Sequence, residues 1–185
     1  MVFNFYTSLS FVISIIFFFL SKPVIQIFTE SSYHSGFIII GIISLSYLIK
    51  GVYMIFLPGI YYNKKLHIQS LIEWIAAILN LGLNFLFIPK LGILGAALAT
   101  LLSYLSLPIL TKLYTNRLLP IDYDWSRLSK NLFVFLICVS IILMNSYYFS
   151  LNIIDEFLIN SIISLISIAI IFNEPFKEIK KLKKL

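Results

Sequence analysis

Cysteine, histidine and acidic residues are scarce in this sequence. Its 185 residues include one cysteine, two histidines and eight acidic residues. The single Cys138 excludes a disulfide within the chain and a zinc site built from several cysteines. The sequence also has no glycine-rich phosphate loop, no metal-ligand spacing and no nucleophile motif. It therefore predicts no catalytic site, no metal site and no cofactor.

Charge is scarce as well. Charged residues make up 12% of the chain, about half the share of about 25% found in ordinary domains. Hydrophobic residues make up 60%, and the mean hydropathy is +0.99. Intrinsic disorder is excluded, because it requires low hydrophobicity and high charge. A soluble globular fold is excluded too, because even a domain of about 150 residues leaves roughly 30% of its unfolded surface in water.

Six long apolar runs account for this composition. A membrane-spanning helix needs about 20 mainly apolar residues, whereas membrane β-strands of about 9–11 residues alternate in polarity. The runs are apolar on every face, so the sequence predicts an all-α integral membrane protein with six transmembrane helices. The predicted helices cover residues 3–20, 37–62, 68–88, 91–114, 131–148 and 153–172.

The positive charges predict the orientation. An even number of spans places both termini on one side, and cytoplasmic loops carry an excess of Lys and Arg. Only Lys22 and Lys90 fall on the opposite side. We expect cytoplasmic termini in the cytoplasmic membrane, with lysines that face anionic lipid headgroups rather than nucleic acid. The basic residues expected in the cytoplasm are Lys64, Lys65, Lys112, Arg117, Arg127, Lys130, Lys177, Lys180, Lys181, Lys183 and Lys184.

A few polar residues lie inside the predicted spans. Lys50 is near the middle of the second span, where a lysine costs about 2.5–3.5 kcal/mol. Glu73, Asn80 and Asn84 share one face of the third span. Intramembrane polar groups normally face a cavity or a partner, so we interpret these four residues as candidates for lining a substrate cavity. The alternatives are an ion pair or snorkelling for Lys50, a position at the membrane interface beside Trp74 for Glu73, and hydrogen bonds between helices for the asparagines.

Small residues recur at the start of the fourth span. Their spacing of four residues predicts close backbone contact with a neighbouring helix. The functional interpretation is a contact that slides or rocks, and the alternative is ordinary helix packing. The motif consists of two parallel series, namely Gly92, Ala96 and Thr100, and Gly95, Ala99 and Ser103.

Prolines predict where helices bend. Proline cannot continue the backbone hydrogen-bond ladder of a helix. Pro58-Gly59 and Pro108 lie inside predicted spans, and Pro89 begins the turn between the third and fourth spans. We expect Pro58-Gly59 and Pro108 to kink or loosen their helices and Pro89 to end its helix, and we interpret all of these positions as candidate hinges.

The run at residues 78–100 (ILNLGLNFLFIPKLGILGAALAT) resembles a hairpin found late in polysaccharide and O-antigen flippases. These flippases belong to the multidrug/oligosaccharidyl-lipid/polysaccharide exporter superfamily. Weaker similarity at residues 21–23, 33, 61–65 and 120–125 extends the resemblance over residues 1–130. Such proteins have two similar six-helix lobes, often with two extra helices, that expose a central cavity alternately to each side of the membrane.

The resemblance implies that this chain is the C-terminal part of such an exporter. Residues 1–114 would then form four helices of the second lobe, residues 115–130 a cytoplasmic interfacial loop, residues 131–172 two additional helices, and residues 173–185 a basic cytoplasmic tail. The implied function is translocation of an undecaprenyl-diphosphate-linked oligosaccharide for polysaccharide biosynthesis. The implied partners are this substrate, membrane lipids, and either a missing N-terminal lobe (from a split chain or gene fragment) or further copies of the chain.

Two other functions stay open. One is half of a multidrug exporter, and the other is a membrane enzyme or scaffold component of envelope glycan assembly. An enzyme should carry clustered Asp, Glu, His or Arg residues in a loop on one side. The predicted outer loops hold few charged or histidine residues, and this scarcity favours transport. These residues are Lys22, Glu30, His34, Lys90, Asp155 and Glu156.

Overall fold

The computed structural model describes residues 2–116, 123–148 and 153–182 of the chain. Over these residues every regular element is a helix, and six helical segments are long and apolar enough to span a membrane. The chain is therefore an all-α, multi-pass membrane protein, as the sequence predicts. Its contacts define two compact units. Unit 1 comprises residues 1–37 and 124–185, and unit 2 comprises residues 38–123.

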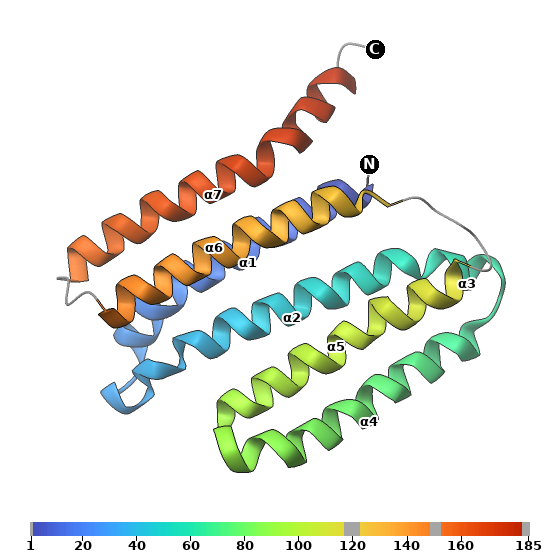
Figure 1. Ribbon diagram of the computed structural model, residues 1–185, viewed down its shortest axis with the longest axis horizontal. Helices are drawn as coiled ribbons and strands as arrows, with labels where there is room; N and C mark the ends of the chain where they lie inside the picture. The colour runs from blue at the N-terminus through green and yellow to red at the C-terminus, as the bar shows by residue number, and fades with distance from the viewer. Residues whose placement is uncertain (1, 117–122, 149–152, 183–185) are drawn as a thin grey trace. The chain divides into compact units, whose positions relative to one another are not determined.

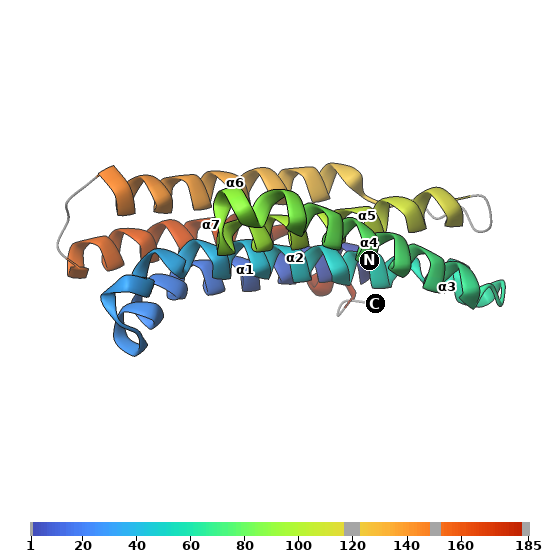
Figure 2. The same ribbon diagram turned by 90° about the horizontal axis from the view of Figure 1, so that it is seen from below.

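Unit 1 is a bundle of three long helices, α1 (Val2–Phe28), α6 (Trp125–Tyr148) and α7 (Ile153–Leu182). The short 3₁₀ helix η1 (Ser31–Gly36) contacts α1. Each long helix contacts the other two, with α1 and α6 running in the same direction and α7 antiparallel to both (Figure 1 and Figure 2). Consequently α1 begins and α7 ends at the same end of unit 1.

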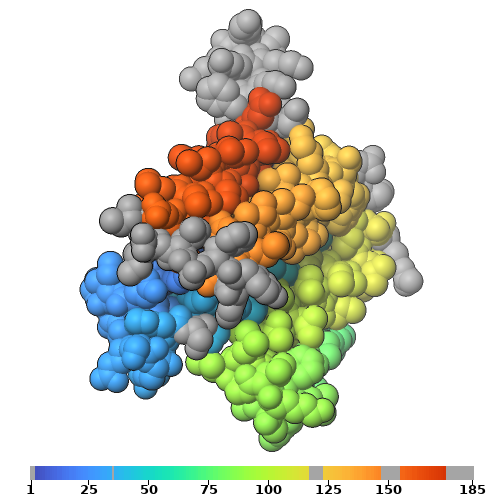
Figure 3. Space-filling view, turned by 60° about the vertical axis from the view of Figure 1, so that its left-hand side comes forward, coloured from blue at the N-terminus to red at the C-terminus, as the bar shows by residue number. Residues whose placement is uncertain are grey.

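The buried positions of unit 1 recur at heptad spacing. In α6 they are Asn131, Phe135, Cys138, Ile142 and Asn145, which is the spacing of helices that pack side by side along their length. Figure 3 shows α6 and α7 lying against each other in this way. Many of the buried positions carry polar or small side chains. We call this set the polar seam: Ser8, Asn131, Cys138, Asn145, Asn160, Ser164 and Ser167.

Hydrogen bonds join the helices along the polar seam. Asn131 Nδ2 of α6 donates to Ser8 Oγ of α1 at 3.0 Å. Asn145 Nδ2 of α6 donates to Asn160 Oδ1 of α7 at 3.1 Å. Within lipid there is no hydrophobic driving force between helices, so close packing and such hydrogen bonds hold them together.

Unit 2 contains most of α2 (Phe37–Phe56), then α3 (Pro58–Tyr62), α4 (Leu66–Leu91) and α5 (Ile93–Thr115). The last two form an antiparallel hairpin, joined at Gly92 in a backbone conformation (φ 58°) that suits glycine. Its core draws on all four helices. The core residues are Tyr53, Leu57, Ile60, Ile72, Ala76 and Leu107.

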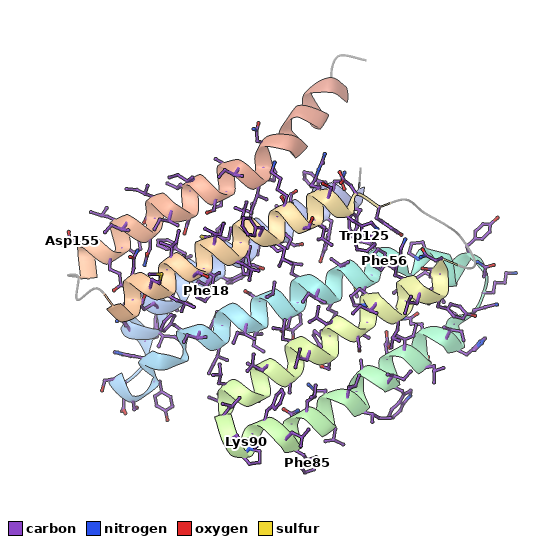
Figure 4. All side chains as sticks on the ribbon, viewed as in Figure 1. Phe18, Phe56, Phe85, Lys90, Trp125 and Asp155 are labelled. Carbon is purple, nitrogen blue, oxygen red and sulfur yellow. The ribbon has the colours of Figure 1, made fainter. Side chains whose placement is uncertain are left out.

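The outer surface of unit 2 is strongly apolar. On α4, Trp74 is 68% exposed and Phe85 is 74% exposed. An exposed apolar surface of this extent marks a membrane or protein contact. Phe85 and Lys90 lie near the α4–α5 turn, and Phe56 lies toward the opposite end of unit 2 (Figure 4).

Several helices are longer than the sequence predicts. α1 continues through Pro23 to Phe28, and α4 continues through Pro89 to Leu91, so the expected helix end before Pro89 is wrong. A proline removes only one backbone hydrogen bond, and a carbonyl freed near a helix end is close enough to the membrane surface to bond water or headgroups. α6 already begins at Trp125, and α7 continues to Leu182, because polar residues at a membrane boundary do not have to end a helix.

The predicted segments of a larger exporter stay predictions. Residues 117–122 of the interfacial loop and residues 183–185 of the tail lie outside the described residues. The predicted segments group residues 1–114 and residues 131–172. The contacts within the structure instead place α1 in one unit with α6 and α7.

Candidate functional site

Lys50 lies on α2, half-buried within unit 2. Its ammonium nitrogen is 5.2 Å from the centroid of the Tyr104 ring on α5. Tyr47, one turn earlier on α2, meets the same ring edge-on at 6.1 Å between centroids. A cation over an aromatic face is attracted by the ring quadrupole. Among the described residues, no carboxylate lies within ion-pair distance of the Lys50 nitrogen.

Glu73 of α4 is held by two hydrogen bonds to the same carboxylate oxygen. Tyr53 of α2 donates its hydroxyl to Oε1 at 2.8 Å, and Gln69 of α4 donates Nε2 at 3.0 Å. Tyr53 stands one turn beyond Lys50 on α2. Glu73 is therefore near the lysine but is bonded to other groups.

The two asparagines of α4 form a short hydrogen-bonded chain. Asn84 Nδ2 donates to Asn80 Oδ1 at 3.0 Å, and Asn80 Nδ2 donates to Ser103 Oγ of α5 at 3.2 Å. Asn84 Oδ1 is buried and accepts no hydrogen bond from the residues that the structure describes. Asn80 contacts Ser103, and Lys50 contacts the next residue, Tyr104. Asn80 and Lys50 therefore lie at the same level of α5. The Asn80–Ser103 contact is the hydrogen bonding between helices considered as the alternative for these asparagines.

The small-residue motif splits into two halves of different burial. Gly95, Ala99 and Ser103 are buried, whereas Ala96 and Thr100 are half-buried and Gly92 is exposed. A Cβ atom on Gly95 would lie 2.5 Å from the carbonyl oxygen of Phe87 in α4. The backbones of the hairpin therefore approach so closely at this point that only glycine fits.

The proline positions behave differently from one another. α2 ends at Phe56 and α3 begins at Pro58. The helix predicted over residues 37–62, which is expected to kink or loosen at Pro58-Gly59, is thus interrupted at Leu57. Pro108 lies inside the continuous α5, where the Tyr104 carbonyl loses its usual donor. The hinge function of Pro58, Gly59, Pro89 and Pro108 stays a prediction.

Aromatic rings and a lysine meet where α2 and α5 end. Lys112 Nζ lies 4.2 Å from the centroid of the Tyr123 ring and 5.9 Å from that of Phe56. These two rings meet edge-on at 4.7 Å. Burial raises the pKa of the Tyr123 hydroxyl, because desolvation disfavours the phenolate. These contacts hold Tyr123, the last residue of unit 2, against the ends of α2 and α5.

Unit 1 contains an ion pair that sequence reasoning missed. Lys22 of α1 pairs with Glu156 Oε1 of α7, and Ser146 of α6 donates its hydroxyl to the same oxygen at 2.6 Å. The available signal was weak: one lysine near the end of the first span and one glutamate near the start of the last, on the same predicted side. Phe18 and Asp155 lie toward this end of unit 1, opposite Trp125 (Figure 4).

The structure gives no support for metal chemistry over the part of the chain that it describes. It brings together no group of three or more His, Cys, Asp or Glu side chains that could hold a metal ion. Comparison with family models, curated proteins and solved structures finds no match. The candidate site therefore consists of a mid-span cation, two tyrosines and a polar face of α4.

Proposed function

We propose that this chain is part of a membrane exporter that moves an undecaprenyl-diphosphate-linked oligosaccharide across the cytoplasmic membrane by alternating access. The main support is the position of Lys50. It is a half-buried cation within a span, and no carboxylate among the described residues pairs with it. Such a cation requires a cavity, water or an anionic partner, and the diphosphate of a lipid carrier is such a partner.

The neighbours of Lys50 support the same proposal. Tyr47 and Tyr104 offer apolar ring faces beside the cation, and Asn80 offers an amide at the same level of α5. Rings, an amide and a cation together suit a ligand that joins a sugar to a phosphate. The resemblance of residues 78–100 to flippases supplies the class of substrate.

We propose that a second lobe completes the transporter. Alternating access requires two bodies around one site, and six helices supply about one. The exposed apolar face of α4 is available for a second lobe or for lipid. We further propose that both termini are cytoplasmic, because nearly all loop lysines and arginines fall on their side.

The test is lipid flipping by variants of Lys50, with residues 1–185 co-expressed with a complementary lobe and reconstituted in liposomes. Lys50→Arg should retain most of the flipping rate. Lys50→Gln should lower it roughly 10- to 100-fold, since a hydrogen bond to a charged group contributes about 1.5–3 kcal/mol. Lys50→Glu should abolish it.

Lys90→Gln is the matched control, because it removes an exposed lysine at the end of α4 and should leave the rate unchanged. Full flipping by Lys50→Glu at normal expression would exclude Lys50 from substrate binding. Retained transport of an uncharged or cationic drug by the same variant would favour the multidrug exporter instead.

A further inference from the structure

At one end of unit 1, the carboxylate of Glu156 links α1, α6 and α7. Glu156 near the start of α7 accepts from Lys22 of α1 and from Ser146 of α6. The side chains of Lys22 and Glu156 are only 23% and 14% exposed. A pair this sheltered is screened less than a surface ion pair. We call these three residues the clasp.

A small cavity lies beside the clasp. Its volume is about 40 Å³, which is enough for water, because one water molecule needs roughly 10–15 Å³ measured in this way. Besides the clasp, Gln26 and Asn160 supply polar groups, and phenylalanine rings supply apolar walls. Pro23 also lines it, and because proline has no N–H, the carbonyl of Phe19 lacks its helical donor there. The cavity is therefore largely apolar, with a few polar groups that can hydrogen-bond a water molecule.

The polar seam leads inward from this cavity. Asn160 lines the cavity and also accepts the hydrogen bond from Asn145. Farther along, the buried hydroxyl of Ser164 lies beside Cys138, which is 1% exposed. Cys138 lies eight residues before Ser146 on α6, or about 12 Å at 1.5 Å per residue. Polar side chains therefore run from the cavity toward the interior of the span.

We propose that the clasp is a gate that controls the entry of water into the polar seam between α1, α6 and α7. With the clasp closed, Asn160 at the wall of the cavity is hydrogen-bonded to Asn145, and both asparagines are buried. When the ion pair between Lys22 and Glu156 opens, the start of α7 separates from α1. Water can then reach the side chains of the polar seam that lie deeper in the span. This gate belongs to unit 1 and does not depend on the function proposed for Lys50.

The test uses the only cysteine of the chain as a reporter. The rate of Cys138 modification by a small water-soluble methanethiosulfonate is measured on the full chain in membranes. Lys22→Gln and Glu156→Gln should each react roughly tenfold faster than the wild type, the order expected when one charge-assisted bond no longer holds the closed state. The double variant Lys22→Glu/Glu156→Lys should return to within about threefold of the wild type.

Asp155→Asn is the matched control, because Asp155 is an exposed neighbour outside the clasp, and its rate should equal that of the wild type. Equal rates in the wild type and both single variants would overturn the gate. An acceleration that the charge swap does not reverse would overturn it too, because it would trace to lost packing. If the single variants fail to fold, Ser146→Ala keeps the ion pair and loses one hydrogen bond. An unchanged rate in that variant would contradict the gate, and a modest acceleration would support it.

Discussion

Gly95 shows how one residue sets the spacing of a helical hairpin. Its Cα lies so close to the end of α4 that an added Cβ would reach the Phe87 carbonyl oxygen at 2.5 Å and the carbonyl carbon at 2.6 Å. Both atoms belong to the backbone, which cannot move aside as a flexible side chain can. By contrast, a Cβ on Gly82 of α4 would meet no atom within 4 Å. The two glycines therefore have different structural roles in the same hairpin.

Gly95→Ala should destabilise the α4–α5 hairpin by about 1–3 kcal/mol, the usual cost of overpacking. The measurement is the free energy of unfolding in mixed detergent micelles. Gly82→Ala is the control, and it should be neutral or slightly stabilising, because alanine favours helix more than glycine does. Equal stability of Gly95→Ala and the wild type would mean that the hairpin is looser than described.

At the scale of elements, the break between α2 and α3 shows how position decides the effect of a proline. Pro58 starts a new helix after Leu57, and Leu57 is part of the unit 2 core. Pro23, Pro89 and Pro108 lie inside helices that continue. A proline at the first turn of a helix is well tolerated, whereas an interior proline costs one hydrogen bond and a steric contact.

Pro58→Ala should join α2 and α3 into one helix, because alanine restores the missing N–H donor. The expected result is roughly tenfold slower hydrogen exchange at the amides of Ile60 and Tyr61, since a continuous helix opens less readily than a short terminal one. Pro89→Ala is the control: α4 already continues through that position, so exchange in α4 should change little. Unchanged exchange at both amides would show that another contact causes the break.

Asn145 and Asn160 should act as a pair between α6 and α7. Replacing either one by leucine leaves a buried amide unpaired, which costs about 1–3 kcal/mol. Replacing both should cost less than the sum of the single changes, by about 0.6–1.7 kcal/mol, the range of measured couplings between membrane helices. Unfolding in mixed micelles measures all three variants.

Ser140→Ala on the exposed side of α6 is the control for the paired asparagines, and it should change stability by less than about 0.5 kcal/mol. Strict additivity of the two asparagine replacements would contradict the pairing.

At the scale of the whole molecule, the chain closes unit 1 with helices from its two ends. α1 contacts α6 and α7, although α2 to α5 lie between them in the sequence. Because α1 and α6 run in the same direction, an even number of spans separates their starts. This agrees with the four spans, α1, α2 with α3, α4 and α5, that the chain crosses before α6 begins, and with an α1 start and an α7 end on the same side.

The proposed orientation predicts which residues an impermeant thiol reagent reaches in intact cells. In a Cys138→Ser background, Lys90→Cys at the α4–α5 turn should be labelled from outside. Lys64→Cys, on the predicted cytoplasmic side, should be labelled only after the cells are opened. Positive charges near the spans set this orientation. Labelling of Lys90→Cys from the cytoplasm alone would reverse it.

The sequence by itself determined the class of the protein, the number of spans and the position, Pro58, at which the second span is disturbed. These properties follow from local features, since hydrophobic length decides whether a helix can cross a membrane and proline acts on its own turn. The spacing of Glu73, Asn80 and Asn84 in the sequence also placed them on one face of α4. Helix ends were less predictable, because a polar residue such as Lys22 continues a helix when a partner satisfies it.

Only the tertiary structure decided which helices pair and which polar groups meet. Lys22 and Glu156 are 134 residues apart in sequence, Ser8 and Asn131 are 123 apart, and Lys50 meets the ring of Tyr104 rather than a carboxylate. In a soluble protein, polarity separates the buried face of a helix from its exposed face. In a membrane both faces are apolar, so hydrophobicity does not distinguish a neighbouring helix from lipid. The few polar contacts that fix the pairing exist only once the helices have come together.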